Sequence, residues 1–453
     1  MGNLQKINDA ISSVVFGMPT TMLFLAVGIL FTIGCGFFQI KKIKLISKKT
    51  FLSLFDKSSR TKSVKNSFSK LQSLSTSLAA TIGTGSIVGV AAAITTGGAG
   101  AVFWMWICAF FGMMTAFAEN VLAIKYRKAD KNGGFSGSAM HYMERGLNAK
   151  WLGKIFALFC VLASFGMGNM AQGNSVASAA NEAFGVPVKI SAIILTSILV
   201  VVVIGGIQAL GRVTELCVPF MAIFYVAGTL IILVLNFDKL PSVMSCIVKD
   251  AFGFSSACGG AVGIGVKKAI EVGFRRGVFS NEAGLGTTAS VHASSETKEP
   301  VEQGMWGMLE VFIDTFIICT LTAFVILVTN SAGNDEAGSI IVTSFSRGLG
   351  GFGKYFAAIS IILFSVATII GWSFIGEKAF EYLFPKAKAS LYKAVFVTVT
   401  YIGAISSVKV VLDISDTFNG LMAIPNIVAL ILLSGEVISE TKSYLKSRTR
   451  HDV

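Results

Sequence analysis

Long apolar segments recur along the whole chain, and each is long enough to cross the hydrocarbon core of a membrane as a helix, which takes about 20 residues. They lie at 14–38, 72–95, 101–125, 151–183, 188–208, 213–236, 242–275, 304–329, 353–383, 390–411 and 417–438. Only 14% of the 453 residues are charged, against roughly 25% in an ordinary soluble domain. The sequence therefore predicts an all-α polytopic membrane protein with about eleven transmembrane helices.

The basic residues of the loops set the expected orientation, because Lys and Arg accumulate on the cytoplasmic side of membrane proteins. The loop after the first helix holds ten of them between Lys41 and Lys70, so it is expected inside. The base-poor loops then lie outside, which predicts an extracellular N-terminus and a cytoplasmic C-terminus. The net charge of +13 is spread over several loops rather than one face, so nucleic acid is not expected as a partner. The expected surroundings are the lipid bilayer.

Two of the predicted helices carry glycine clusters, IGTGSIVG at 82–89 and SSACGGAVGIG at 255–265. Glycine inside a helix costs roughly 1 kcal/mol relative to alanine, so each cluster is a place where the helix can open. A single cluster also fits close helix packing through small residues. The two clusters lie five helices apart, which divides the chain into two halves with opposite orientation. Corresponding broken helices in inverted halves are typical of the binding site of a secondary transporter.

The same division gives the expected organisation of the chain. Residues 1–40 hold an extracellular segment and the first transmembrane helix, and residues 41–71 form a basic cytoplasmic loop. Residues 72–236 form the first five-helix repeat, residues 237–438 the second, and residues 439–453 a basic cytoplasmic tail. An enzyme is not expected, because the histidines are scattered and the GxSxG and HExxH motifs are absent. No cofactor is expected, and the oligomeric state stays open.

Five longer motifs closely resemble the alanine or glycine:cation symporter family. They are IGTGSIVGVAAAITTGGAGAVFWMW (82–106), GMGNMAQGN (166–174), RRGVFSNEAGLGTTASVHA (275–293), MLEVFIDTFIICTLTAFVILV (308–328) and IIGWSFIGEKAFEYLF (369–384). The resemblance implies a fold similar to the LeuT-type transporters, with one helix ahead of a core of two inverted five-helix repeats. It also implies sodium-driven uptake of alanine or glycine across the plasma membrane of a prokaryote.

An amino-acid zwitterion inside a membrane needs a partner for each of its charges. Free backbone N–H groups at the N-terminus of a half-helix suit the carboxylate, and Thr84, Gly85 and Ser86 are the expected donors. Carbonyls left unpaired at a half-helix C-terminus suit the ammonium, and we expect them from Gly259 and Gly260 to Val262 and around Ala80. No charged side chain is required by this arrangement.

Two further residues are candidates for contact with the substrate. Gln172 matches a family position that faces substrate, and its amide suits either end of a zwitterion. Trp372 is similar to a pocket-wall aromatic that limits the size of the substrate side chain. Helix packing, or for Trp372 a place at the membrane interface, explains each residue equally well.

Sodium is a hard cation, for which oxygen ligands are expected. In LeuT-like folds they come from carbonyls of the first broken helix and hydroxyls of the eighth core helix. By position, the resemblance implies the carbonyls of Ala79 and Ile82 with the hydroxyls of Ser365 and Thr368. The alternative is that these hydroxyls bond their own backbone, which is common for Ser and Thr in membrane helices.

Two residues keep proton coupling open as an alternative. The family usually has asparagine after GTG, where this chain has Ser86, and Asp314 is an acidic residue at membrane depth, a functional candidate by default. Asp314 is expected to bind a proton or a cation, or to cap broken backbone. Glu119 is instead expected to pair with Lys125 or Arg127. The alternative function is a proton-coupled symporter, or a transporter of another small neutral amino acid on the same fold.

Overall fold

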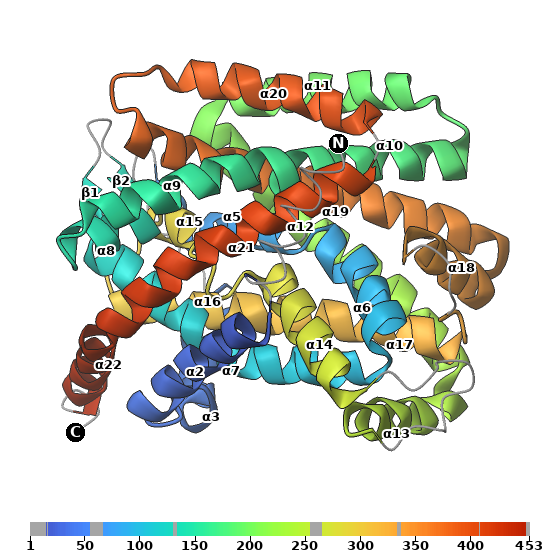
Figure 1. The fold of residues 1–453 in the computed structure, drawn as a ribbon, viewed down its shortest axis with the longest axis horizontal. Coiled ribbons are helices and arrows are strands. Elements are labelled where there is room, and N and C mark those ends of the chain that lie inside the picture. Colours follow the sequence, from blue (N-terminus) through green and yellow to red (C-terminus); the bar gives the residue numbers. More distant parts are fainter. Residues whose placement is uncertain are drawn as a thin grey trace.

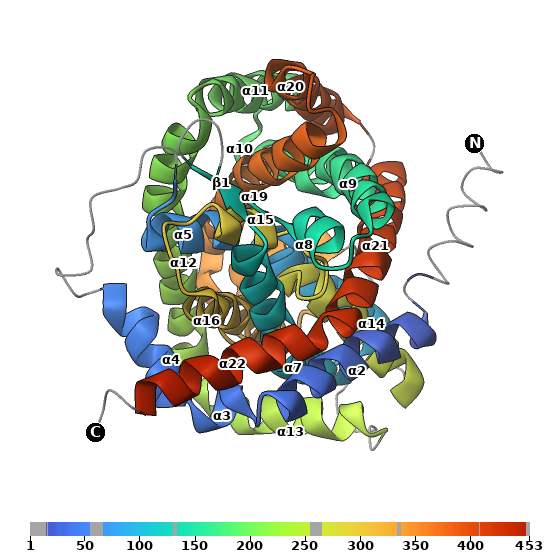
Figure 2. The ribbon, with the colours of Figure 1, turned by 90° about the vertical axis from the view of Figure 1, so that its left-hand side faces the viewer.

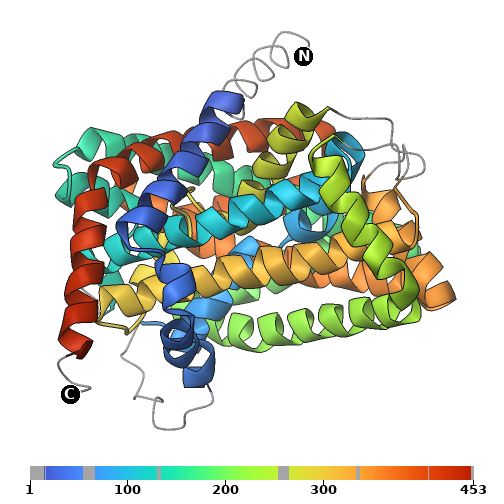
Figure 3. The ribbon, with the colours of Figure 1, turned by 90° about the horizontal axis from the view of Figure 1, so that it is seen from below.

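Nearly all of the described chain is helical. The computed structural model describes residue 15 and residues 17–54, 67–129, 134–253, 265–332, 337–406 and 408–449, with the backbone alone for 408–416 and 449. The long helices run side by side along the longest dimension of the molecule in Figures 1 and 3, and Figure 2 looks along them. The two short strands β1 (Lys128–Ala129) and β2 (Phe135–Ser136) pair antiparallel at one end.

The elements follow in chain order, with η marking 3-10 and π-helical turns. Up to residue 235 they are α2 (Met18–Gly34), α3 (Phe38–Lys41), α4 (Ile43–Lys49), η1 (Phe51–Leu54), α5 (Lys70–Thr81), η3 (Gly85–Gly89), α6 (Val90–Gly97), α7 (Gly100–Lys125), α8 (Ala139–Arg145), α9 (Lys150–Phe165), η4 (Gly166–Met170), α10 (Ala171–Phe184), α11 (Val188–Ile204) and α12 (Gly206–Leu235). After it they are η5 (Phe237–Lys239), α13 (Leu240–Ala251), α14 (Val266–Asn281), α15 (Ala289–Ala293), α16 (Pro300–Val311), η6 (Phe312–Cys319), α17 (Thr320–Val328), α18 (Ala337–Leu349), η7 (Gly350–Phe352), α19 (Gly353–Leu383), α20 (Ala389–Ile405), α21 (Val408–Leu432) and α22 (Ser434–Thr449).

The surface of these helices is suited to lipid. Large apolar side chains stand exposed along α11 and α12, among them Ile204 at 76%, Leu216 at 76% and Val234 at 71%. Contiguous exposed apolar surface of this kind marks contact with a membrane or another protein. By length and composition, five of the described helical segments can span a membrane, or seven when each of two bent pairs counts as one span. The chain is a membrane protein, as its hydropathy predicts.

The break predicted in 82–89 is present. Helix α5 begins with a capping box, in which the Ser69 hydroxyl accepts from the Gln72 N–H and the Gln72 side chain accepts from the Ser69 N–H. It ends at Thr81, because Ile82 leaves the helical region with φ −78° and ψ 86°. The chain resumes as the π-helical turn η3 and then α6, and the two parts are bent by 52°.

A second break interrupts the chain between α14 and α15, at residues 282–288. Three residues here have positive φ, Glu282 at 56°, Gly284 at 94° and Gly286 at 72°. The predicted cluster at 255–265 lies outside the described residues except for Gly265, which directly precedes α14. Helix α14 itself runs without interruption from Val266 to Asn281. The predicted single helix at 242–275 is therefore wrong, because α13 and α14 are separate helices.

The two broken helices lie against each other in opposite directions. Helix α6 packs against α14, and α5 packs against α15, so the first part of one broken helix meets the last part of the other. At the ends of these helices Phe68 forms an isolated bridge with Ser295, in which the Phe68 N–H donates to the Ser294 carbonyl at 3.0 Å. The Glu296 N–H in turn donates to the Phe68 carbonyl at 3.0 Å. The pairing brings the two breaks together in the middle of the bundle.

Several predicted boundaries need correction. The predicted loop 41–71 contains the short helices α4 and η1, and the helix α18 was not predicted at all. The helix predicted at 417–438 is two helices, α21 and α22, bent by 57° at a break after Leu432. Helix α22 takes in most of the predicted tail and crosses the end of the bundle, at the left of Figure 3. Length alone did not separate spanning helices from helices that lie across them.

Candidate functional site

The first break faces the end of α14. A Cβ atom at Gly85 would lie 3.6 Å from the Ser280 Cα and 3.7 Å from the Phe279 carbonyl oxygen, so the backbones are in van der Waals contact. The candidate residues around this contact are closed off from solvent, since Ser86, Gln172, Asp314 and Trp372 are each at most 1% exposed. The breaks and the side chains that face them form one buried polar centre.

Gln172 reaches the first break directly. It lies on α10, two residues after the end of the π-helical turn η4, and its Oε1 accepts from the Thr84 N–H at 3.4 Å. Its Nε2 donates to the Met167 carbonyl at 3.3 Å. The Ser86 N–H donates to the Gly83 carbonyl at 3.2 Å. Two of the three amides expected to bind a carboxylate therefore already have partners, and both bonds are long enough to be exchanged for a better acceptor.

Trp372 joins η4 to the second break. The ring is fully buried on α19, and its Nε1 donates to Glu282 Oε1 at 3.1 Å. The Thr287 hydroxyl donates to the other oxygen of Glu282 at 2.5 Å, so the carboxylate closes a loop across the break. The ring also presses on Gly168, where a Cβ would lie 2.4 Å from the Trp372 Cγ. Only glycine leaves room for the ring in this position.

Asp314 lies against Ser86 at the first break. Asp314 Oδ1 accepts from the Ser86 hydroxyl at 2.5 Å, and its two oxygens accept from the Ser280 hydroxyl at 3.0 and 2.8 Å. Oδ2 also accepts from the Thr315 hydroxyl at 3.0 Å. The Thr322 hydroxyl donates to the Ser86 carbonyl at 3.0 Å. The two residues that kept proton coupling open in the sequence are thus direct partners, and π-helical η6 is the element that carries Asp314.

The four proposed sodium ligands are partly brought together. Thr368 Oγ1 lies 3.5 Å from the Ile82 carbonyl, although it also bonds its own helix at the Phe364 carbonyl, at 3.0 Å. Ser365, one turn earlier on α19, is fully buried and its hydroxyl has no partner among the described residues. The Ser365 hydroxyl and the Ile82 carbonyl supply oxygen atoms of the type that a hard cation prefers as ligands. Ala79 is fully buried in the last turns of α5.

Glu119 has a role that the sequence did not indicate. Its Oε1 accepts from the Gly286 N–H at 2.9 Å and from Asn426 Nδ2 at 2.6 Å, so it binds backbone of the second break. The expected pairing of Glu119 with Lys125 or Arg127 is wrong. Lys125 instead pairs with Glu436 and Glu440 on α22.

Arg127 holds the chain that leaves α15. Its guanidinium donates to the carbonyls of Ala293 at 3.1 Å, Ser295 at 2.7 Å and Thr297 at 2.6 Å. Burial lowers the pKa of the Arg127 guanidinium to about 10, so it stays charged at neutral pH. The end of the second broken helix is therefore fixed by charge-assisted hydrogen bonds.

Glu282 is the residue that sequence reasoning missed. It stands in the quoted motif SNEAGLGTT, in which an acidic residue precedes two glycines spaced by one residue. That pattern was available as a signal, because an acidic residue inside a membrane segment is a functional candidate and spaced glycines permit positive φ. The centre as a whole offers backbone N–H groups, carbonyls, hydroxyls and carboxylates at membrane depth. Such a set can pair with both charges of a small molecule, or with a cation.

Comparison with known proteins agrees with this chemistry. The model of the sodium:alanine symporter family matches residues 1–452. The sodium/alanine symporter AgcS of Methanococcus maripaludis is 41% identical over 448 residues, covering 97% of each chain. The probable sodium/glutamine symporter GlnT of Bacillus subtilis is 37% identical over 431 residues, covering 94% of this chain and 88% of that protein.

A solved structure shares the fold at low sequence identity. The crystal structure of the Eremococcus coleocola manganese transporter in complex with a bis-isothiourea compound superposes with a TM-score of 0.55 at 13% identity. The match covers 83% of this chain and 82% of that one. The fold is therefore one that transporters use, and the relatives are transporters rather than enzymes. By the match along its full length and by its relatives, the chain belongs to the sodium:alanine symporter family.

Proposed function

We propose that the protein takes up alanine or glycine, or both, together with sodium, by alternating access. The observation that carries this proposal is the contact of Gln172 with the Thr84 N–H, because it places a polar amide against broken backbone in a buried centre. The family and the relative named as a sodium/alanine symporter support the substrate and the ion.

The substrate carboxylate binds at the first break in this proposal, to the backbone N–H groups of Thr84, Gly85 and Ser86. Gln172 turns its amide from Thr84 to the substrate when the substrate arrives. The ammonium was expected near Gly259 and Gly260, and we now place its contacts at the second break, 282–288, since that segment faces the first. The Glu282 carboxylate supplies a negative charge there. Trp372, wedged against Gly168, limits the substrate to a small side chain.

Sodium binds beside the first break in the same proposal. The Ala79 and Ile82 carbonyls and the Ser365 and Thr368 hydroxyls supply oxygen ligands. The unpartnered Ser365 hydroxyl and the 3.5 Å approach of Thr368 to Ile82 support this assignment. A cation at this position would fix the bent end of α5 against α19. Because it neutralises carbonyl dipoles that the bend leaves free, sodium stabilises the state that binds substrate.

We further propose eleven spans for the transporter, with the N-terminus outside and the C-terminus in the cytoplasm of a prokaryotic cell. The first is α2, and the others form a LeuT-like core of two inverted repeats of five. The first repeat is α5 with α6, α7, α9 with α10, α11 and α12, and the second is α14 with α15, α16 with α17, α19, α20 and α21. The opposite pairing of the two broken helices supports this division. The proposed repeats occupy 72–236 and 237–438, after residues 1–40 and the basic segment 41–71 and before the cytoplasmic stretch 439–453.

Proton coupling is the second candidate, and the contacts of Asp314 favour it. This buried carboxylate accepts hydrogen bonds from Ser86, Ser280 and Thr315 without a basic partner among the contacts described. A proton would neutralise it in the same place where a cation would. The site would then couple substrate binding at the first break to protonation of Asp314.

Uptake of labelled alanine and glycine into proteoliposomes tests both versions. Membrane potential is held fixed, sodium is replaced by choline, and pH is varied separately. Sodium coupling predicts that uptake collapses in choline at every pH, whereas unchanged uptake in choline removes the sodium assignment. Competition by a panel of amino acids that includes glutamine tests the size limit, because the proposed wall at Trp372 predicts that glutamine competes poorly.

A further inference from the structure

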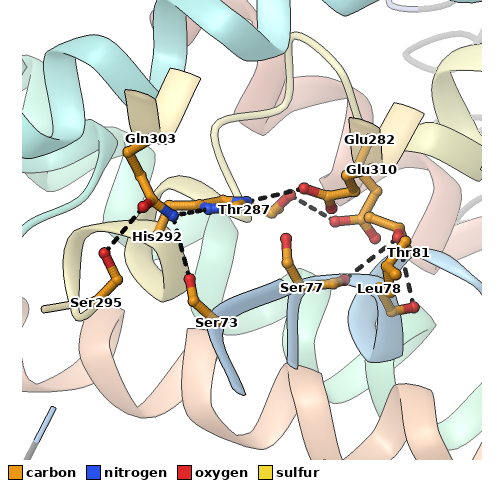
Figure 4. A network of polar contacts seen from close by, with 10 residues as sticks. All are labelled: Ser73, Ser77, Leu78, Thr81, Glu282, Thr287, His292, Ser295, Gln303 and Glu310. Atoms are coloured by element: carbon orange, nitrogen blue, oxygen red, sulfur yellow. Dashed lines mark hydrogen bonds and ion pairs between the residues drawn. The ribbon is translucent and has the colours of Figure 1, made fainter. Parts of the chain in front are cut away.

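A buried chain of polar side chains links α5, α15 and α16 beside the second break (Figure 4). Gln303 Nε2 donates to the Ser73 hydroxyl at 3.3 Å and lies 2.5 Å from His292 Nδ1. His292 Nε2 lies 3.0 Å from Glu310 Oε2. His292, Gln303 and Glu310 are at most 1% exposed. Among the described residues, no hydrogen bond joins this chain of side chains to residues 82–84, so it adds a polar group to the centre on the side of the second break.

The hydrogen bonds assign the donor and acceptor nitrogens of His292. The Ser295 hydroxyl donates to Gln303 Oε1 at 3.1 Å, which turns the NH2 group of Gln303 toward His292. An NH2 group only donates, so His292 Nδ1 accepts and carries no proton. The ring proton is then on Nε2, which donates to Glu310. In this arrangement the hydrogen bond from His292 reaches one oxygen of Glu310, Oε2.

The surroundings of Glu310 add negative charge. Glu119, Glu282 and Asp314 are each near enough to interact electrostatically with Glu310, and all three are at most 1% exposed. Among the fully buried side chains of the described residues, none is a Lys or Arg. An ionised carboxylate in such a place is very costly unless a positive charge accompanies it. A bound ion would supply that charge.

Two oxygens stand ready to bind that ion. Glu310 Oε1 and the Ser77 hydroxyl have no hydrogen-bond partner in the part of the chain that the structure describes, and both residues are at most 1% exposed. Ser77 lies one turn after Ser73 on α5, and Glu310 lies two turns after Gln303 on α16. At about 1.5 Å per residue, Glu310 comes level with the stretch between Ser77 and Thr81. Figure 4 shows the Ser77 hydroxyl pointing away from α5 toward the side where Glu310 lies.

We propose that Glu310 Oε1 and the Ser77 hydroxyl bind a monovalent cation, a sodium ion or a proton, that is transported in addition to the sodium ion at the first break. This rests on the proposed function, since it adds a second coupling ion to the same cycle. A metal that needs several acidic or imidazole ligands does not fit, because the described residues hold no group of three or more His, Cys, Asp or Glu suited to one. Release of the cation would leave Glu310 unpaired and would favour separation of α5 from α16, which admits water.

The test measures how many charges enter with each alanine. Purified protein is reconstituted in vesicles, and the membrane potential that stops net alanine flux is found at several sodium and pH gradients. Glu310→Gln removes the charge and keeps the shape, so the ratio of charges to alanine is expected to fall by one. The matched control is Glu302→Gln on the same helix, whose carboxylate pairs with Lys49 at 2.6 Å. Labelled sodium and an internal pH dye show whether the ion that the wild type transports and Glu310→Gln does not is sodium or a proton.

A second measurement does not depend on transport. Sodium and pH titrations of the thermal unfolding midpoint report cation binding to the purified protein without alanine. We expect Glu310→Gln to lose one of the two responses and Ser77→Ala to weaken it several-fold, whereas Ser360→Ala, a buried serine that bonds its own helix, keeps both. A Glu310→Gln variant with the wild-type charge ratio or both titration responses overturns the proposal. Failure of the wild type to take up alanine with sodium would instead contradict the proposed function, and the titrations would still test Glu310.

Discussion

Gln172 is the main candidate for substrate recognition, because its side chain bonds the Thr84 N–H at the first break. We expect Gln172→Ala to reduce alanine uptake at least tenfold, because the variant has no amide to turn toward the zwitterion. The matched control is Asn174→Ala on the same helix, which removes a buried amide that bonds the Ser406 carbonyl instead. Uptake at equal amounts of reconstituted protein measures both, and equal losses in the two variants would contradict a specific role for Gln172.

Gly168 and Trp372 form the second test at the level of single residues. A methyl group at Gly168 overlaps the Trp372 ring, so Gly168→Ala forces the ring away from Glu282. We expect a loss of stability of about 1–3 kcal/mol, as for other overpacked cores, together with weaker discrimination against larger amino acids. Gly338→Ala on α18 is the control, because nothing lies within 4 Å of its added methyl group. Thermal unfolding and competition by larger amino acids measure the two effects.

The candidate residues were predictable to different degrees for physical reasons. Motif positions such as Gln172, Ser86 and Asp314 stand on helices whose apolar neighbours fix their depth, so the sequence places them near the centre. The partnership of Ser86 with Asp314 joins positions 228 residues apart, and no local pattern encodes it. Glu119 was misassigned because sequence distance favours Lys125, whereas its side chain turns inward to the Gly286 N–H.

At the scale of elements, the two breaks show what glycine content does and does not predict. The first cluster opened its helix where Ile82, whose N–H still bonds the Leu78 carbonyl, leaves the helical region at ψ 86°. The second break needed only Glu282, Gly284 and Gly286 with positive φ, and fewer glycines than the cluster at 255–265. Backbone conformation, rather than the number of glycines, decides where a helix ends.

Substitutions distinguish the two possible positions of the second break. Gly284→Ala places a side chain at φ 94°, and its Cβ would lie 2.6 Å from a Phe24 ring carbon. Because strained backbone of this kind costs about 1–3 kcal/mol, we expect loss of uptake and a lower unfolding temperature. Gly265→Ala meets nothing within 4 Å and is expected to behave as the wild type. The opposite result, with Gly265→Ala inactive and Gly284→Ala active, would return the site to the cluster at 255–265.

For the molecule as a whole, hydropathy predicts a helical membrane protein, and the charge of the loops predicts on which side of the membrane each loop lies. It does not predict how helices pair, because the contact of α5 with α15 and of α6 with α14 depends on side chains far apart in the chain. Helices that lie across the bundle, such as α22, are also hidden, since their composition is less apolar than that of a span. The contacts of α5 with α15 and of α6 with α14 join the ends of the two broken helices.

The contacts of Arg127 therefore give a test of movement in the whole molecule. The guanidinium holds the carbonyl of Ala293, the last residue of α15, and those of Ser295 and Thr297 after it, and each charge-assisted bond contributes about 1.5–3 kcal/mol. In the proposed alternating access and orientation this end opens toward the cytoplasm, so we expect Arg127→Ala to favour the open state. A shift of only about 1.4 kcal/mol already changes the open population tenfold.

A cysteine at position 297 reports that opening. Thr297 is 6% exposed and its hydroxyl has no hydrogen-bond partner within the described ranges, so Thr297→Cys changes little else. Cys217 is replaced by Ser first, because it is the exposed member among the free cysteines of the described residues. We expect Arg127→Ala to raise labelling by a maleimide at least tenfold and Lys128→Ala, an exposed neighbour, to leave it unchanged. If sodium and alanine also change the labelling rate of the Thr297→Cys protein that keeps Arg127, the α15 end moves during the cycle. A labelling rate that responds neither to Arg127→Ala nor to substrate would place the gate elsewhere.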